Sequence, residues 1–244
     1  MITLFSNPHR FMALSSWLAP VMYVGAGVLV CLSIWLGIYQ LPAEEVQGDS
    51  ARILIVHVPA AHLAMTSYVG MAIMSFVWFI WRHELADIAA KSIAPVGMVY
   101  TGLCLLTGAI WGKPTWGTWF EWDDPRMLFV LILFFLFMGY LSLRAAMPTR
   151  KMASTAGAIV AMAGVVIVPL IKFSVDWFAS LHQDASIIRA DGPSMAPEFL
   201  LPLFSGLIGH TLLFGALTLT LMRASVWQRR ADVLRARWLN EGVA

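Results

Sequence analysis

The segment Trp111-Gly-Lys-Pro-Thr-Trp-Gly-Thr-Trp-Phe-Glu-Trp-Asp-Asp-Pro-Arg126 separates two long apolar stretches and holds four tryptophans. In a membrane protein, the end of an apolar stretch is where the chain meets water. Tryptophan favours that position because its ring is apolar and its N–H needs a polar partner, which accounts for one or two of the indoles. The surplus predicts a platform for a flat aromatic ligand.

Composition assigns the chain to the membrane. It has 244 residues, of which 59% are hydrophobic and only 12% charged, and its mean hydropathy is +0.76. Six apolar segments are long enough to cross roughly 30 Å of hydrocarbon, and none alternates as a strand would. We predict an all-α integral membrane protein in which residues 1–244 form one membrane domain. Its spans lie near residues 17–39, 53–81, 93–111, 127–147, 153–173 and 199–222.

Charge predicts how these spans are oriented. Six crossings return the chain to its starting side, so both termini lie in one compartment. Lys and Arg concentrate on that side, whereas most Asp and Glu fall in the loops on the other. Since the cationic side is normally cytoplasmic, residues 223–244 are expected to form a basic cytoplasmic tail. The tryptophan-rich loop 112–126 and the loop 174–198 are expected to face the periplasm, from a bacterial inner membrane.

Two chemical signatures are absent from the sequence. There is no C-x-x-C-H for covalent c-type haem and no G-x-x-x-x-G-K-[ST] for a P-loop ATPase. Cys31 and Cys104 lie inside predicted spans, where disulfide exchange is disfavoured. ATP hydrolysis or covalent haem attachment would therefore require a partner protein. We expect contacts with membrane lipid and none with nucleic acid.

The histidines can be sorted by this topology. His57 lies at the outer start of the second span, and His182 lies in the loop 174–198 of the same compartment. His62 is five residues from His57, about 140° around a helix, so these two are poor joint ligands. His210 lies near the middle of the last span, where a polar ring is often functional. A buried imidazole that holds two helices together is an equally good interpretation of His210.

Together these features predict a site for an iron porphyrin. Such a group needs axial nitrogen ligands, a flat apolar contact and cations near its propionates. His57 and His182 are the candidate metal ligands. The candidate stacking residues are Trp116, Trp119, Phe120 and Trp122, and the candidate propionate partners are Lys113, Arg126, Arg52 and Arg189.

Each element also has a purely structural interpretation. A single interfacial histidine is more often packed or solvated than bound to a metal, and tryptophans at a membrane boundary are usually anchors. Asp123 and Asp124 would suit the N-terminus of the following helix, with Pro125 in its first turn. The density of indoles beside two outward histidines is what favours the porphyrin site.

The motif Trp111-Gly-Lys-Pro-x-Trp116-Gly-Thr-Trp119-x-x-Trp122-Asp123 resembles the tryptophan-rich (WWD) signature of haem-handling proteins. The six-span layout, with His57-Val-Pro-Ala-Ala and Leu181-His182-Gln, resembles the CcmC family of cytochrome c maturation proteins. In that family, an Arg commonly follows the motif one position earlier than Arg126 does here. The resemblance covers nearly the whole chain.

The resemblance implies a function. Proteins of this kind hold b-type haem, without a covalent bond, at the outer face of the inner membrane. The loop from Trp111 to Asp123 would serve as platform and His57 and His182 as axial ligands. They promote covalent attachment of haem to the chaperone CcmE, and work beside the ABC-type complex of CcmA and CcmB with the small protein CcmD. The resemblance implies a haem-transfer protein with no catalytic residue of its own.

Three other functions remain alternatives. A membrane subunit of an ABC-type or small-solute transporter would carry ionisable or broken-helix features at the bilayer midplane, and the spans offer little besides His210. A b-type electron-transfer protein would ordinarily place paired histidines inside facing spans. A haem lyase related to CcmF would be larger, with further spans.

Overall fold

The computed structural model describes residues 7–182, 192 and 194–241. Across these residues the chain is helical, apart from turns and an isolated bridge between Glu44 and Gly48. The elements in chain order are α1 (Pro8–Tyr39), the 3₁₀ helix η2 (Asp49–Ile53), α2 (Leu54–Trp81), α3 (Glu84–Trp116), α4 (Pro125–Ala146), α5 (Arg150–Gly164), α6 (Ile167–Trp177) and α7 (Pro197–Glu241).

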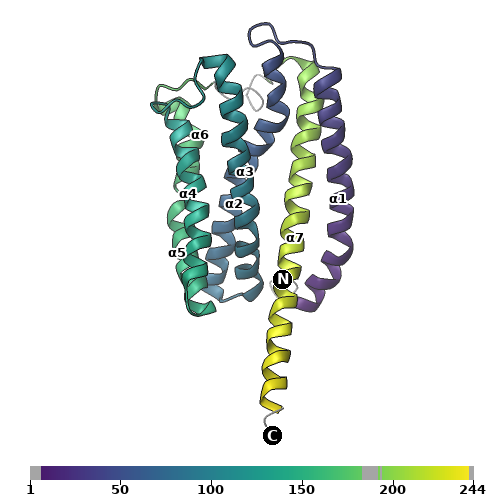
Figure 1. Cartoon of the computed structure of the whole chain (residues 1–244), viewed down its shortest axis with the longest axis vertical. Coiled ribbons are helices and arrows are strands. Elements are labelled where there is room, and N and C mark those ends of the chain that lie inside the picture. The colour runs from purple at the N-terminus through teal and green to yellow at the C-terminus, as the bar shows by residue number, and fades with distance from the viewer. Residues whose placement is uncertain (1–6, 183–191, 193, 242–244) are drawn as a thin grey trace.

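Six helical segments of the described chain are long and apolar enough to cross a membrane, which confirms the predicted all-α membrane fold. Helices α2 to α6 pack side by side as one bundle, while α1 packs mainly against α7 beside them (Figure 1). We call the end where α2 and α4 begin and α3 and α6 end the loop end. The opposite end, where α1 begins and α7 ends, is the basic end.

Polar side chains cap the starts of four helices. Asn7, His83, Asp124 and Thr149 each precede a helix and accept a hydrogen bond from a backbone N–H in its first turn. These N–H groups have no partner within the helix, so a side-chain acceptor fixes the starting residue. His83 is therefore a helix cap.

The main core lies between α2, α3, α4 and the α5–α6 segment. Its fully buried large side chains include Tyr68, Phe137 and Tyr140. Gly97 of α3 makes their close approach possible, because a Cβ there would lie 2.5 Å from Ser67 Oγ and 2.6 Å from Phe137 Cζ. This packing holds the loop ends of α2, α3 and α4 in fixed register.

The third span is longer than we predicted. We expected residues 93–111, but α3 covers Glu84–Trp116 and ends at Gly117, whose φ of +81° favours glycine. Charged residues interrupt the apolar run without interrupting helical hydrogen bonding. The predicted loop 112–126 is therefore shorter, and Trp111 and Trp116 lie on the last turns of a helix.

The fifth span is broken, where we predicted one helix over 153–173. Helix α5 ends at Gly164 and α6 begins at Ile167. Pro169 has no N–H to donate to Val165, and its ring crowds that carbonyl. Val168 N donates to Val165 O instead, at 3.1 Å, which tightens the chain at the break.

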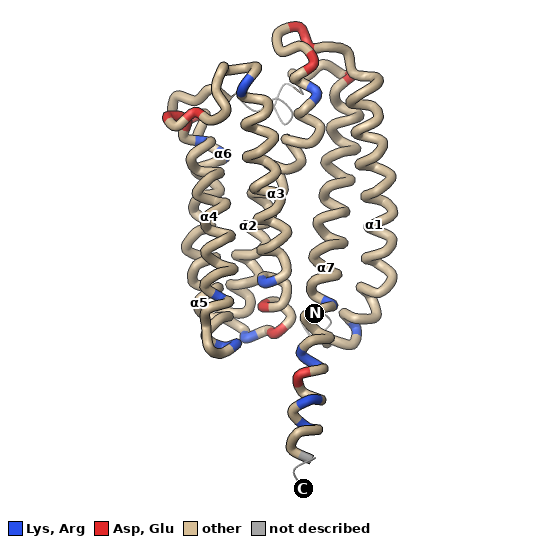
Figure 2. The backbone as a smooth tube through the Cα atoms, in the orientation of Figure 1, with Lys and Arg blue, Asp and Glu red and all other residues tan. Residues whose placement is uncertain are grey.

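The sixth span also exceeds its predicted bounds of 199–222. Helix α7 continues without a break through the basic segment to Glu241 and projects beyond the other helices (Figure 1). Most Lys and Arg residues lie at this end of the molecule, and several Asp and Glu residues lie at the loop end (Figure 2). The basic tail is thus an extension of a span and not a separate element.

Candidate functional site

The residues predicted to form the site converge on the loop end. His57 lies on the first turn of α2, Trp111 and Trp116 on the last turns of α3, and His182 in the segment after α6. The His57 ring contacts Trp111 and the His182 ring contacts Trp116, and both tryptophans lie near the end of α3. Tertiary structure therefore brings together two histidines that are far apart in sequence.

The His57 ring is held between α2 and α3. Its Nδ1 lies 2.9 Å from Thr107 Oγ1, and the same hydroxyl donates its proton to the Leu103 carbonyl at 2.7 Å. A hydroxyl has one proton, so Thr107 accepts from the Nδ1–H of His57. This tautomer leaves Nε2 unprotonated, which is the form that binds a metal. Gly108 makes room for the ring, because a Cβ there would lie 3.1 Å from His57 Cε1.

Asp124 fixes the position of His182. It is 2% exposed and accepts hydrogen bonds from Met127 N at 3.1 Å, Ser180 Oγ at 2.7 Å and Leu181 N at 2.8 Å. The His182 Nδ1 lies 3.3 Å from the same carboxylate. One carboxylate thus both begins α4 and ties down the segment that carries His182, with the imidazole Nδ1 turned toward it.

The electrostatics favour a neutral His182 beside an ionised Asp124. Burial lowers the pKa of His182 and nearby Arg126 lowers it further, while Asp124 only partly opposes this. Burial by itself would raise the pKa of Asp124, but the hydrogen bonds from Ser180, Leu181 and Met127 bring the pKa below its usual value. At neutral pH His182 is therefore an imidazole, with Nε2 available as a ligand.

The four tryptophans have two kinds of surroundings. Trp111 meets the His57 ring edge-on with centroids 5.6 Å apart and donates its indole N–H to Gln47, and Trp116 lies 5.0 Å from the His182 ring. Trp119 and Trp122 are 57% and 66% exposed. The first pair packs against the imidazoles and the second is available to a ligand or partner.

The remaining aromatic and acidic candidates lie in the short loop after α3. Phe120 is partly buried, and its ring contacts that of Trp122 at a centroid distance of 4.7 Å. Asp123 is exposed and makes no hydrogen bond or ion pair with the described part of the chain. Its neighbour Asp124 makes the contacts instead.

The predicted cations have different surroundings. Lys113 Nζ donates to the Gly117 carbonyl at 2.9 Å and is exposed. Arg126 donates to Ser174 Oγ at 3.2 Å and lies near His182. Arg52 donates to the carbonyls of Ile38 and Leu41 and pairs with Asp49, so it closes the end of α1. Arg189 lies outside the described residues.

Comparison of the sequence with known proteins identifies related proteins. A sequence model of the CcmC family, described as heme exporter protein C, matches residues 1–237. The chain is 42% identical to heme exporter protein C of Bradyrhizobium diazoefficiens, over 94% of this chain and 87% of the relative. It is 38% identical to that of Paracoccus denitrificans, over 96% of each chain. For the Escherichia coli K12 protein, the identity is 37%, over 88% of this chain and 86% of the relative.

The chain belongs to the CcmC family. Membership confirms the resemblance and supports a haem-handling role in cytochrome c maturation for this multi-pass membrane protein. It also supports a transport or handling protein over a classical enzyme, and haem over a general solute.

In this CcmC-family chain, His210 and His62 lie outside the candidate haem site. The Tyr100 hydroxyl contacts His210 at both Nδ1 and the backbone carbonyl, each at 3.2 Å, which joins α3 to α7. This contact agrees with the interpretation of His210 as a residue that holds two helices together. His62 lies one to two turns beyond His57 on α2 and is exposed.

Sequence reasoning missed two positioning residues of this CcmC-family site. It identified Asp124 as a possible helix cap but gave no link to His182, 58 positions away. Thr107 had no distinguishing signal, because a threonine inside an apolar span usually bonds only to its own helix, as its bond to Leu103 shows. Only the approach of α2 to α3 reveals its contact with His57.

Proposed function

We propose that the protein holds haem at the periplasmic face of the bacterial inner membrane and delivers it to the haem chaperone CcmE. His57 and His182 serve as the axial ligands. The observation that carries the proposal is that both imidazoles lie at the loop end with Nδ1 engaged, by Thr107 and by Asp124. Metal-binding histidines commonly have one ring nitrogen held in this way.

The periplasmic orientation rests on charge. Lys and Arg gather at the basic end of the bundle, which is the end expected to face the cytoplasm (Figure 2). The site would then face the periplasm, where cytochrome c maturation needs its haem. The CcmA–CcmB complex and CcmD are the proposed partners, since the sequence has no ATPase motif of its own.

We propose two roles for the tryptophans in haem binding. Trp111 and Trp116 fix the two imidazole planes by ring contacts. The exposed rings of Trp119 and Trp122, with Phe120, offer apolar surface to the macrocycle and to the chaperone. The haem is bound without a covalent bond to this chain, as b-type haem, until it is attached to CcmE.

Among the candidate cations, Arg126 and Lys113 are the proposed partners of the propionates. Arg126 lies near His182, and Lys113 is exposed on the last turn of α3. Arg52 is less suited, because its terminal nitrogens already donate to Ile38, Leu41 and Asp49.

Transfer of haem requires that one ligand leave the iron. His57 is part of a packed helix, whereas His182 lies in an irregular segment held mainly through Asp124. Segments of this kind move more readily than helices. We therefore propose that His182 is displaced first and that the haem edge is then presented to CcmE.

Spectroscopy of the purified protein tests the ligands. Two axial imidazoles give low-spin haem, so His57→Ala or His182→Ala should convert the spectrum to a high-spin form and lower haem content. The double variant should lose most of its haem. His62→Ala is the matched control, because His62 lies on the same helix as His57 but is exposed on another part of its surface. A double variant with full haem content and an unchanged Soret band would contradict the assignment.

A second measurement separates haem transfer from electron transfer. Mixed with purified CcmE, a transfer protein should lose haem to it, whereas an electron carrier would keep its haem through reversible redox cycles. Retention of all haem in the presence of the chaperone would argue against delivery even if both ligands are correct.

A further inference from the structure

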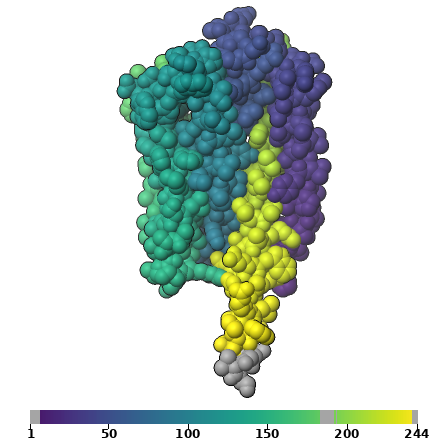
Figure 3. Space-filling model, viewed as in Figure 1, coloured from purple at the N-terminus to yellow at the C-terminus, as the bar shows by residue number. Residues whose placement is uncertain are grey.

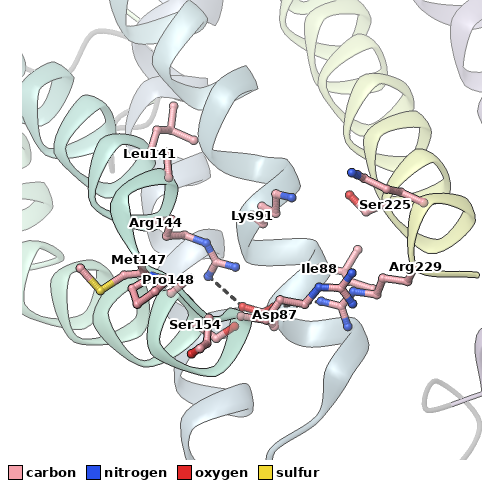
Figure 4. Close-up of a pocket in the computed structure, with 15 residues that line it drawn as sticks. Asp87, Ile88, Lys91, Leu141, Arg144, Met147, Pro148, Ser154, Ser225 and Arg229 are labelled. Atoms are coloured by element: carbon pink, nitrogen blue, oxygen red, sulfur yellow. Dashed lines mark hydrogen bonds and ion pairs between the residues drawn. The ribbon is translucent and has the colours of Figure 1, made fainter. Parts of the chain in front are cut away.

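A cavity of about 450 Å³ opens at the basic end of the molecule, opposite the end that holds His57 and His182 (Figure 4). It lies between α3, α4, α5 and α7, and nothing in the haem site accounts for it. The side chains around it include Lys91 of α3, Arg144 of α4, Ser154 of α5 and Arg229 of α7.

The cavity is rich in positive charge. Four of its lining residues are cations, namely Lys91, Arg144, Arg150 and Arg229, and Asp87 is the one acid among the described residues that line it. Several cations that converge on one concave surface favour an anionic ligand.

Carboxylates already neutralise the three arginines. Asp87 is 4% exposed and pairs with Arg144 at 2.8 Å and with Arg229 at 3.1 Å. Arg229 also pairs with Glu84, and Arg150 pairs with Asp232 at 2.6 Å. Both described hydrogen bonds of Arg144 come from Nη1. Since a guanidinium has five N–H donors, the arginines can hold an anion without giving up these pairs.

Four polar side chains of the cavity make no hydrogen bond or ion pair within the described residues, namely Lys91, Ser154, Ser225 and Gln228. Lys91 is exposed and forms no ion pair with any other described residue. The Ser154 hydroxyl makes no hydrogen bond within the described chain and is accessible from the cavity. An ammonium and a hydroxyl donor on the same cavity suit the oxygens of a phosphate group.

An apolar strip leads away from this cavity along α3. Val99, Leu106 and Ile110 are 65%, 60% and 47% exposed and follow Lys91 at helical spacing, so the four side chains share one face. Figure 3 shows α3 uncovered between α4 and α7. The strip lies within a segment that spans the membrane, so hydrocarbon can lie along it.

We propose that this cavity binds the phosphate headgroup of an anionic phospholipid, with an acyl chain along the α3 strip. Basic pockets between membrane helices are a recognised setting for anionic headgroups. A free phosphate would use the cations but would leave the adjoining apolar strip without a role. The bound lipid would fill the space between α7 and α4–α5, and so would join the basic extension of α7 to the bundle. This proposal is independent of the haem ligands.

Native mass spectrometry of the delipidated full-length protein tests the site. The protein is titrated with phosphatidylglycerol, with phosphatidylcholine and with inorganic phosphate. We expect one tightly bound phosphatidylglycerol, weaker binding of phosphatidylcholine and no retained phosphate. Lys91→Gln should weaken phosphatidylglycerol binding about fivefold, the effect expected when one lysine near an anionic headgroup is neutralised. Ser154→Ala should weaken it by a smaller factor.

Lys151→Gln is the matched control. Lys151 is an exposed lysine at the same end of the molecule, but it does not line the cavity. Circular dichroism and haem content report whether each variant is folded. If Lys91→Gln and Lys151→Gln lowered the phosphatidylglycerol affinity equally, the effect would come from general surface charge, and the proposal would be overturned. Equal affinity for the two lipids would overturn it as well. Retention of inorganic phosphate alone would assign the cavity to a free anion instead.

Discussion

The two histidines of the site are held by different parts of the molecule and by different means. His57 lies in a packed interface of two helices, where a hydroxyl of α3 holds its Nδ1. His182 lies in an irregular segment after α6, where the buried carboxylate of Asp124 holds both the imidazole and the backbone beside it. Helix packing therefore positions one candidate ligand, and a small number of polar contacts positions the other. Disruption of those contacts should therefore affect His182 more than His57.

The largest effect is expected from Asp124→Ala. It removes the acceptor for Met127, Ser180 and Leu181 and the partner of His182 at once. Loss of such a supporting group typically costs 10–100-fold in metal affinity. We expect a comparable loss of haem affinity and a shift from low-spin to high-spin haem, measured by haem titration and electron paramagnetic resonance.

Asp123→Ala is the matched control for that variant. Asp123 is the adjacent carboxylate but is exposed and has no contact of this kind in the described chain. Asp124→Asn adds a second comparison, since asparagine still caps a helix but lacks the charge. Equal haem affinity of the Asp123 and Asp124 variants would show that the segment is held by something other than the carboxylate.

A smaller effect is expected on the His57 side from Thr107→Val. Valine has nearly the shape of threonine but cannot accept the Nδ1–H of His57. Because helix packing still holds the ring, haem affinity should fall by no more than about tenfold, the low end of the range for supporting groups. Haem titration measures the change. Thr211→Val is the control, because Thr211 bonds only to Leu207 of its own helix. A loss as large as that of Asp124→Ala would contradict the difference between the two sides.

Gly108→Ala tests the space around His57 and should have a smaller effect again. The new methyl would lie 3.1 Å from Cε1, so the ring must move by a few tenths of an ångström. We expect a change of a fewfold in haem affinity and a small shift of the Soret band. In Gly102→Ala the methyl would meet only Phe134, at 3.4 Å. An unshifted band for Gly108→Ala would mean that the imidazole is less closely confined than the structure indicates.

The smallest effect is expected in the acid–base behaviour of His182. Because burial lowers the pKa of His182 below its usual value of 6.5, more than half of the imidazole should be neutral and able to bind iron at pH 6.5. Arg126 contributes to this, since a nearby cation disfavours imidazolium. Arg126→Gln should therefore raise the pKa of His182, so that protonation occurs at a higher pH.

Nuclear magnetic resonance of labelled histidine in the haem-free protein measures that pKa directly. Lys172→Gln serves as control, because it removes a cation from α6 that does not affect the pKa of His182. A pKa for His182 above 6.5 in the unaltered protein would contradict the role assigned to burial.

Sequence predicted the architecture well because only helices and closed barrels can cross the hydrocarbon core of a membrane. The six spans, the helical class and the candidate ligands follow from apolar length and residue type. Boundaries were less well predicted: charged residues end an apolar run but not a helix, so α3 continues to Trp116 and α7 to Glu241. The break before α6 could have been inferred from Pro169, although a proline in a span does not always interrupt the helix.

Composition predicted the candidate site residues, and the structure adds their surroundings. Four indoles in one short segment indicated a platform, which stays a prediction. Trp111 and Trp116 contact imidazole rings, while Trp119 and Trp122 are exposed. Trp111 and Trp116 lie on helix α3, where each step of one residue turns the side-chain direction by about 100°. Trp119 and Trp122 lie in the loop that follows. The sequence alone did not show where the helix ends, so it did not predict which rings would face the imidazoles.

Sequence by itself determined that this protein is a six-span, haem-handling member of its family, because hydrophobic length, charge asymmetry and a specific motif are properties of consecutive residues. Tertiary structure alone decided how the ligands are held. The contacts of Thr107 with His57 and of Asp124 with His182 join positions 50 and 58 residues apart. Such contacts depend on how closely the helices and loops pack against one another. Local sequence does not specify that packing.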